Sequence, residues 1–241
     1  MMKRSMLSLF LATTMVGCAQ WGKTVKGNGD WTTVERSTKD YDALALSGWF
    51  TVKLVDGQEG ALILRGESNL LEHLVTEVRN NTLTIKTKNG VRLKPSNWKD
   101  GIEVTVPVRD IEDIALSGSG DIVGSTTLGG NTLNTKMSGS GDITLDVDVN
   151  TLKAILSGSG DMELSGRTTR FEATVSGSGD IEAFDLAADH VEATVSGSAD
   201  IEVTAKESLS ARVSGSGDIA YKGSPTKVDA KTSGSGDITK Y

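Results

Sequence analysis

One pentapeptide constrains the fold more than any other feature of this sequence. Ser-Gly-Ser-Gly-Asp occurs six times between residues 117 and 237, and Ser-Gly-Ser-Ala-Asp fills residues 196–200. The spacings between successive aspartates are 21, 19, 19, 20, 18 and 19 residues. Repetition at about this period is typical of solenoids, in which each repeat buries its apolar face only against its neighbours. The aspartates are Asp121, Asp142, Asp161, Asp180, Asp200, Asp218 and Asp237.

The residues that flank each pentapeptide keep one register from repeat to repeat. A large apolar residue lies nine positions before an aspartate, a small residue seven before it, and another apolar residue five before it. Leu152, Ala154 and Leu156 are an example. A spacing of two is strand periodicity, so one face of each strand is expected to be buried. Stacked coils continue each apolar row, and parallel connections are right-handed. We therefore predict an all-β fold, with a right-handed parallel β-helix of about 19-residue coils over residues 111–241. The alternative is an antiparallel sandwich with Gly-rich hairpins, which leaves the fixed register unexplained.

The start of the chain has the features of an export signal. Lys3 and Arg4 precede an apolar run that is too short for a permanent membrane span, which predicts a signal peptide over residues 1–17. The run Met15-Val16-Gly17-Cys18 resembles a bacterial lipobox, in which the cysteine becomes acylated. Cys18 is therefore the predicted lipidation site; an ordinary secretory signal with a bystander cysteine is the alternative. Ala19 resembles the outer-membrane version of lipoprotein sorting signals, which implies a cell-envelope location facing the periplasm or the cell surface.

Nucleotide and nucleic-acid binding are not expected. Residues 17–24 match the phosphate-loop pattern G-x-x-x-x-G-K-T, but that loop needs a strand before it and a helix after it. The formal net charge is -7, so there is no basic excess to neutralise nucleic-acid phosphates. The sequence suggests no cofactor.

The segment before the repeats divides into two parts. Residues 18–37 are polar and rich in Gly and Thr, and we expect a tether. Residues 38–110 are expected to form a β-rich N-terminal part, beginning with a degenerate first coil that has Trp49-Phe50 in its corner. A short helix is expected near residues 68–74. An Asn80-Asn81 turn should join two strands in a hairpin over residues 75–85.

A family resemblance covers residues 27–241. The run Tyr41-Asp-Ala-Leu-Ala-Leu-Ser-Gly-Trp-Phe, then Asn69-Leu-Leu, Asn81-Thr-Leu-Thr-Ile and the repeated Ser-Gly-Ser-Gly-Asp-Ile are similar to the auto-transporter adhesin, head GIN domain family. The resemblance implies a β-helical, exported and often lipid-anchored bacterial protein. It brings no catalytic residues with it.

The aspartates in one register should form a row down one corner. Like charges about 5 Å apart repel by roughly 3 kcal/mol at an effective dielectric of 20, so some interaction must relieve them. We favour hydrogen bonds from turn N–H groups or serine hydroxyls within each coil. The alternative is a row of bridging cations, because Ca²⁺ takes carboxylate oxygens.

Other charged residues offer only repeated or scattered chemistry. The pairs Asp161/Glu163, Asp180/Glu182 and Asp200/Glu202 have glycosidase-like chemistry, but an active site is normally unique and these pairs recur. His190 is expected in a surface loop and His73 on the short helix. Lys86, Lys88, Arg92, Lys94 and Lys99 cluster around Trp98, either as a solvated hairpin or as a contact surface for an anionic polymer or acidic partner.

These features favour a non-enzymatic role. We expect a lipid-anchored envelope protein with an adhesion-like or structural binding function, whose partners are the membrane, through the anchor, and a glycan or an envelope protein. The alternative is a carbohydrate-active β-helix enzyme. A groove holding unlike acids and bases outside the repeat would favour that alternative.

Overall fold

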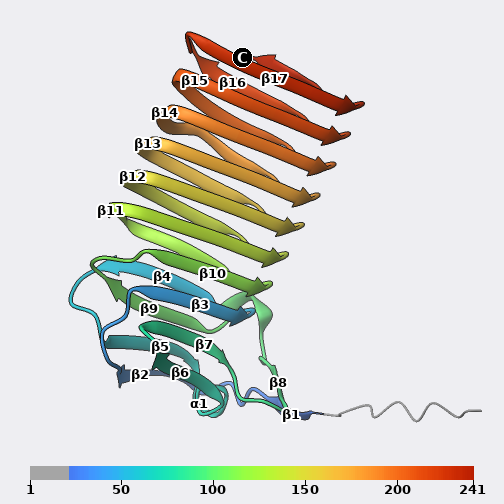
Figure 1. The fold of residues 1–241 in the computed structure, drawn as a ribbon. Helices are drawn as coiled ribbons and strands as arrows, with labels where there is room; N and C mark the ends of the chain where they lie inside the picture. Colours follow the sequence, from blue (N-terminus) through green and yellow to red (C-terminus); the bar gives the residue numbers. More distant parts are fainter. Residues whose placement is uncertain (1–21) are drawn as a thin grey trace, which may run out of the picture.

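The computed structural model describes residues 22–241, so the predicted signal peptide and Cys18 lie outside the described residues. The chain builds a tall stack of coils on a β-rich base (Figure 1). No helix within residues 22–241 has the length and apolarity needed to cross a bilayer. The elements are β1 (Lys23–Lys26), β2 (Trp31–Ser37), β3 (Ala43–Gly48), β4 (Thr51–Asp56), β5 (Ala61–Glu67), α1 (Ser68–Leu71), β6 (Leu74–Arg79), β7 (Thr82–Thr87), β8 (Val91–Lys94), η1 (Trp98–Asp100), β9 (Glu103–Val108), β10 (Asp113–Gly118), β11 (Asp121–Gly139), β12 (Ile143–Gly158), β13 (Met162–Gly177), β14 (Ile181–Gly197), β15 (Ile201–Gly215), β16 (Ile219–Gly223), β17 (Lys227–Gly234) and β18 (Ile238–Lys240).

The repeat region is the predicted parallel β-helix. β10 to β15 pair in parallel in sequence order, β15 then pairs both β16 and β17, and β16 pairs β18. Each corner residue lies beside its counterpart one coil on, as Ser138 lies beside Ser157 and Gly139 beside Gly158. The identical corners therefore recur because identical residues stack on one another.

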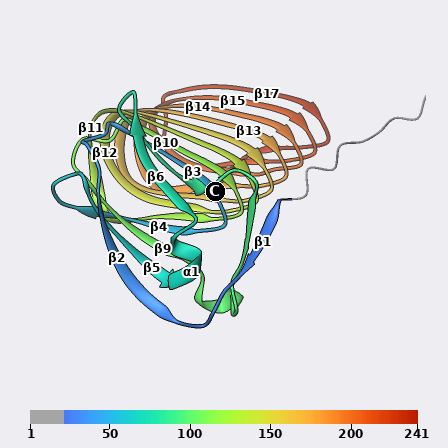
Figure 2. The ribbon, with the colours of Figure 1, turned by 90° about the horizontal axis from the view of Figure 1, so that it is seen from below.

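The core runs along the axis of the stack as continuous rows. In one coil the buried side chains are Ile143, Leu145, Val147, Val149, Leu152, Ala154 and Leu156. The alanine row fits a narrow interior, because seen from below the coils overlie one another as flattened rings (Figure 2). The spacing of two predicted the rows of Leu152, Ala154 and Leu156 from the sequence.

The corner itself depends on glycine. Gly177 has a φ of 150°, and a Cβ at that position would lie 2.2 Å from the carbonyl oxygen of Gly158 in the coil below. A side chain is therefore excluded both by the backbone conformation and by the approach of the neighbouring coil.

The base closes the lower end of the β-helix with antiparallel strands. β3 and β4 form the predicted first coil, with Gly48 beside Gly118. Beneath them, β7 pairs in parallel with β3, and β9 pairs in parallel with β4. Below these, β6 runs antiparallel to β7, β5 to β9, and β2 to β5. The hairpin turn is confirmed, since Asn80 and Asn81 have φ values of 49° and 59°. The antiparallel strands β6 and β5 therefore cover β7 and β9, the lowest parallel strands, and the base does not repeat the structure of the coils above it.

The predicted tether over residues 18–37 is wrong for its described part, residues 22–37. β1 pairs with β8, and all seven residues of β2 pair with β5. Arg36 in β2 donates to the carbonyl oxygens of Leu71 and Leu74 at 2.7 and 2.8 Å, which ties the strand to the end of α1. None of β2 is fully buried, so the strand carries no strong apolar alternation that the sequence could reveal.

Candidate functional site: two hollows around a single short helix

The aspartate row has the predicted position but a different hydrogen-bond pattern. We expected N–H or serine hydroxyl donors within each coil. Instead, Oδ1 of each aspartate from Asp121 to Asp218 accepts the backbone N–H of the aspartate in the next coil. Asp161 accepts from Asp180 at 2.9 Å, and Asp180 accepts from Asp200 at 2.7 Å. The same bond joins every neighbouring pair from Asp121 to Asp237. The next coil supplies the donor because its corner stacks directly on the preceding corner.

In each aspartate from Asp121 to Asp218, one carboxylate oxygen therefore accepts a hydrogen bond from the backbone of the next coil. Among residues 22–241, no group of three or more His, Cys, Asp or Glu side chains is arranged to hold a metal ion. Partial burial, and then the charge of Asp142, raise the pKa of Asp121, although the N–H of Asp142 opposes that shift. The row is a backbone ladder in this structure, and whether cations also bind it stays a prediction.

The glutamates of the repeated acid pairs form a second row, on the outer face. Glu163, Glu182 and Glu202 are register partners on β13, β14 and β15. Glu182 is exposed, but partial loss of solvent around its carboxyl, followed by the charges of Glu202 and Glu163, raises its pKa. Lys222 lies beside this row with its Nζ 3.9 Å from the ring centre of Phe184, so a cation of the chain itself already approaches these acids.

Neither histidine joins a catalytic arrangement. His190 lies within β14 rather than in the predicted loop, with Nδ1 3.0 Å from Oγ of Ser208 and Nε2 3.7 Å from Glu207. His73 lies two residues beyond α1 rather than on it.

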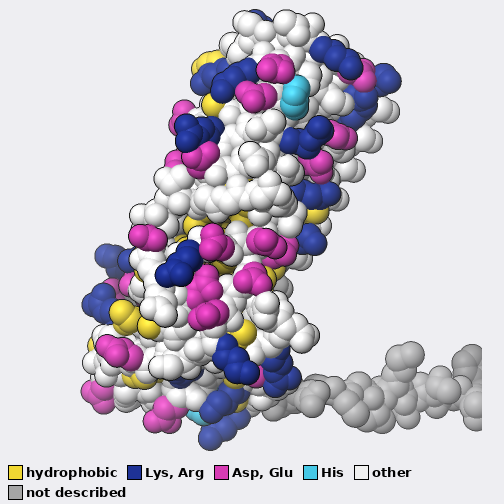
Figure 3. Space-filling view, turned by 60° about the vertical axis from the view of Figure 1, so that its left-hand side comes forward, with side chains coloured by type: hydrophobic (Ala, Val, Ile, Leu, Met, Phe, Trp, Pro, Cys, Tyr) yellow, Lys and Arg dark blue, Asp and Glu magenta, His cyan; other side chains and the backbone are white. Residues whose placement is uncertain are grey.

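The basic cluster of the sequence lies at the base, beside the point where the described chain begins (Figure 3). Lys88, Arg92, Lys94 and Lys99 are exposed, whereas Lys86 is half-buried. Arg92 and Lys94 lie on β8 next to Thr24 and Lys26 of β1. The pairing of two strands far apart in sequence thus adds Lys23 and Lys26 to the predicted cluster.

A hollow beside this cluster, the basal hollow, is apolar at its centre and basic at its rim. Its volume is about 600 Å³, which is within the usual range for a small-molecule site. Trp49 and Trp98 meet in it edge to face, with ring centres 5.1 Å apart. Trp98 is 62% exposed, so much of an indole ring is open to a partner. The lining residues are Thr24, Trp49, Thr87, Val91, Arg92, Leu93, Lys94 and Trp98.

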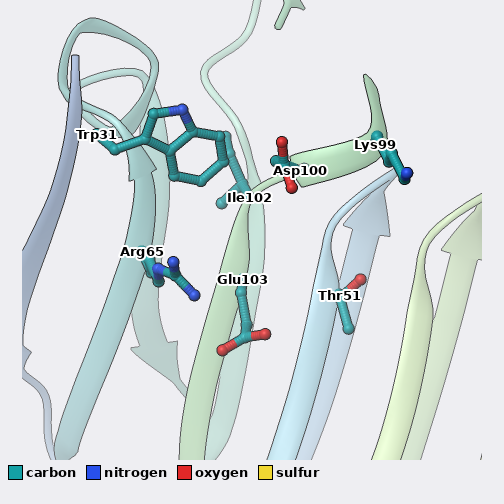
Figure 4. Close-up of a pocket in the computed structure, with 8 residues that line it drawn as sticks. Trp31, Thr51, Arg65, Lys99, Asp100, Ile102 and Glu103 are labelled. Atoms are coloured by element: carbon teal, nitrogen blue, oxygen red, sulfur yellow. The ribbon is translucent and has the colours of Figure 1, made fainter. Parts of the chain in front are cut away.

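A second hollow, the flank hollow, lies on the other side of η1 and has a volume of about 470 Å³. Its floor comes from β4, β5 and β9, and its walls come from β2 and η1. Figure 4 shows the indole of Trp31 and the carboxylate of Asp100 at one end, with Arg65 and Glu103 below them on neighbouring strands. The guanidinium of Arg65 lies 5.9 Å from the ring centre of Trp31. The lining residues are Trp31, Thr51, Arg65, Lys99, Asp100, Gly101, Ile102 and Glu103.

The flank hollow was not predicted from the sequence. Its residues come from four separate segments of the sequence, and Trp31 lies in the predicted tether. An exposed tryptophan in a polar stretch was the one available signal, because aromatic side chains are enriched where proteins bind partners.

A buried glutamate links the two loops that carry Trp31 and Trp98. Glu67 is 1% exposed, and its carboxylate accepts the backbone N–H of Gly29 at 2.6 Å and that of Ser96 at 2.9 Å. Burial alone would raise the pKa of Glu67, but the hydrogen bonds from Ser96 and Gly29 outweigh it and lower the pKa. Glu67 therefore joins the loop before Trp31 to the loop before Trp98 and fixes both aromatic walls.

Solved structures share this architecture. An adhesin described as putative from Bacteroides fragilis NCTC 9343 is 27% identical and has a TM-score of 0.80, with 90% of this chain and 100% of that chain covered. A protein from Parabacteroides distasonis ATCC 8503, described as a putative lipid binding protein, is 29% identical with a TM-score of 0.74, and 91% and 100% are covered. A putative adhesin from Parabacteroides merdae ATCC 43184, at 20% identity and a TM-score of 0.69 with 91% and 99% covered, shares the fold. No curated protein matches the chain.

The family profile described as "Putative auto-transporter adhesin, head GIN domain" matches residues 40–225, which contain most of the base and most of the coils. The resemblance seen in the Ser-Gly-Ser-Gly-Asp repeats and in the first coil is thereby confirmed. This chain belongs to the auto-transporter adhesin, head GIN domain family.

Proposed function

We propose that the protein is a lipid-anchored, non-enzymatic, adhesion-like protein of the cell envelope that binds a glycan in the flank hollow. The observation that carries the proposal is an exposed indole set among charges of both signs. Each sugar hydroxyl both donates and accepts hydrogen bonds. Arg65 and Lys99 offer donors, Asp100 and Glu103 offer acceptors, and Trp31 offers an apolar face for the sugar ring. The adhesin descriptions of the family and of the solved relatives support a binding role.

Lipid attachment at Cys18 and an outer-membrane location, as Ala19 implies, complete the proposal. Cys18→Ser in the full chain should remove the protein from the membrane fraction or leave it as an unprocessed precursor, because the acyl-bearing cysteine supplies the attachment. Fractionation of this variant with membranes, as for the parent, would contradict the anchor.

Glycan binding can be tested with the full-length protein on an array of envelope and host glycans. Trp31→Ala should lower binding at least ~tenfold, since an aromatic anchor in a hollow is a typical hot spot. Trp98→Ala is the matched control: it removes an exposed indole from the other side of η1 and should leave glycan binding unchanged. If the two variants behave alike, the flank hollow is not the binding site.

One observation keeps an enzyme as a second candidate. Asp100 and Glu103 line the same hollow, outside the repeat, together with Arg65 and Lys99. Glu103 is already paired with Lys53 at 2.7 Å, which favours a binding role for its carboxylate. Chromatography of each bound glycan after long incubation separates the two candidates: cleavage that is lost in Glu103→Gln would replace the binding proposal with a hydrolytic or eliminative one.

A further inference from the structure

The basal surface is the strongest positively charged region that the proposed function leaves unused. We define it as Lys23, Lys26, Lys88, Arg92, Lys94 and Trp98. The five basic side chains are exposed, and no ion pair is described for any of them within residues 22–241. Residues 22–26 and 86–98, which supply this surface, contain no Asp or Glu. The repeat region has the opposite character, with 20 acids and 10 bases in residues 111–241.

The short distance in sequence between Cys18 and β1 brings the basal surface close to the membrane that would hold the anchor. β1 begins at Lys23, five residues after Cys18. Five residues span at most ~18 Å even when fully extended. If Cys18 carries the acyl anchor, as the proposed function holds, the base cannot lie farther than that from the bilayer. The base is held near the membrane because the expected tether is instead part of the folded structure.

The chemistry of the basal surface matches a membrane surface. Lysine and arginine are attracted to anionic lipid head groups, and tryptophan lies preferentially at the boundary between head groups and acyl chains. Trp98 combines with Arg92 and Lys94 around one hollow whose interior is apolar. An exposed indole beside two cations is the combination that an interfacial contact requires.

We propose that the basal surface docks on the anionic leaflet that holds the lipid anchor, so that the β-helix stands upright on the membrane. The contact is made by the folded domain itself and is additional to the acyl chain. The residues that line the flank hollow are not part of this contact. The six coil steps from Asp121 to Asp237 then carry the last coil ~29 Å farther from the bilayer.

The test uses the acylated full-length mature protein in vesicles that contain brominated lipids, which quench tryptophan near the acyl boundary. One set of vesicles contains phosphatidylglycerol and phosphatidylethanolamine, and the other only phosphatidylcholine. The difference between the parent and Trp98→Phe isolates the signal of Trp98. Tyr241→Trp places a second probe at the other end, where Tyr241 is 80% exposed.

We expect Trp98 to be quenched in the anionic vesicles and the Tyr241→Trp probe to remain unquenched. Quenching of Trp98 should fall at least ~twofold in phosphatidylcholine, at high salt, and in the double variant Arg92→Glu/Lys94→Glu. The matched control is Arg170→Glu/Lys231→Glu, which makes the same change of charge on the coils and should leave quenching unchanged.

Two failures remain distinguishable. Protein that does not float with vesicles at all would contradict the lipid anchor. Protein that floats but shows no quenching of Trp98, or equal quenching of both probes, would overturn basal docking while leaving the anchor intact. Quenching that is displaced by a soluble anionic polysaccharide but is equal in the two lipid mixtures would assign the surface to a polymer instead.

Discussion

The aspartate of each corner supports the coil that follows it. The carboxylate of Asp180 reaches the N–H of Asp200, so a side chain in one coil satisfies a backbone group in the next. This bond also relieves the repulsion along the row, because each negative charge is placed beside an amide dipole. The row of acids thus adds one backbone hydrogen bond to each step of the stack.

Substitution of Asp180 separates this role from a charge effect. Asp180→Asn keeps a carbonyl acceptor and should change the free energy of unfolding by less than ~0.5 kcal/mol, whereas Asp180→Ala should lower it by ~1 kcal/mol. Asp237→Ala is the control, since no following coil donates to Asp237 among the described residues. Thermal melts with and without a chelator complete the experiment. A large fall in melting temperature on chelation, restored by Ca²⁺, would show that cations bind the row.

The strand elements differ in how clearly the sequence announces them. In the coils, alternation such as Leu152, Ala154 and Leu156 predicted both the strands and their buried faces, because one side of each strand faces the core. β1 and β2 were missed because they lie at the edge of the base with no fully buried residue. The two hollows were missed for a related reason: pairing between distant strands brings their residues together, and no local pattern records that pairing.

The glutamate row across β13, β14 and β15 predicts a stabilising substitution. The pKa of Glu182 is raised, so the folded protein disfavours its ionised form, and this destabilisation is complete above the folded pKa. Glu182→Gln should therefore raise the melting temperature at pH 7 by ~1–2 °C, a small effect because the exposed carboxyl is screened by solvent. The advantage should disappear as the pH falls through the raised pKa towards the ordinary value for glutamate.

Asp148 provides the opposite case for comparison. Hydrogen bonds from Arg167 hold the pKa of Asp148 below its usual range. The stabilisation that Asp148 gives the folded protein is therefore present above its unfolded-state pKa, and it is lost as the pH falls through its folded-state pKa. Asp148→Asn should lower the melting temperature slightly at pH 7. Melts of both variants from pH 3 to pH 8 would contradict this explanation if they shifted in the same direction.

At the scale of the whole molecule, the coils act as interchangeable units on a unique base. The coils contact mainly their neighbours, as expected for a solenoid. The base is different, because antiparallel strands cover its last parallel pair and the hollows open there. Height and binding chemistry are therefore set by separate parts of the chain.

Removal of one coil tests this separation. Deletion of residues 162–180 joins Asp161 to Ile181 and leaves every remaining coil on an equivalent neighbour, because β12, β13 and β14 share one register. The shortened protein should stay folded, with circular dichroism of the same shape, and should be ~4.8 Å shorter by small-angle X-ray scattering. Deletion of residues 163–180 is the control. This shorter deletion leaves one residue too many in the coil. The side chains that follow would then change from the inner to the outer face unless a β-bulge forms, so this protein should melt at a lower temperature. Equal melting of the two deletions would contradict the fixed register.

The aspartate ladder also has a direction, and this bears on how the protein is made. A coil offers its carboxylate to the coil that follows it in the chain, and the corner serines likewise donate backward, as Ser159 does to Gly139. A protein exported from its N-terminus would deliver the base first, and each later coil would then emerge beside a finished edge with its acceptors already in place. If the coils fold in the order in which they cross the membrane, each one pairs only with the coil before it and needs no contact distant in sequence. Duplication of a coil can therefore lengthen the stack without adding a new kind of contact.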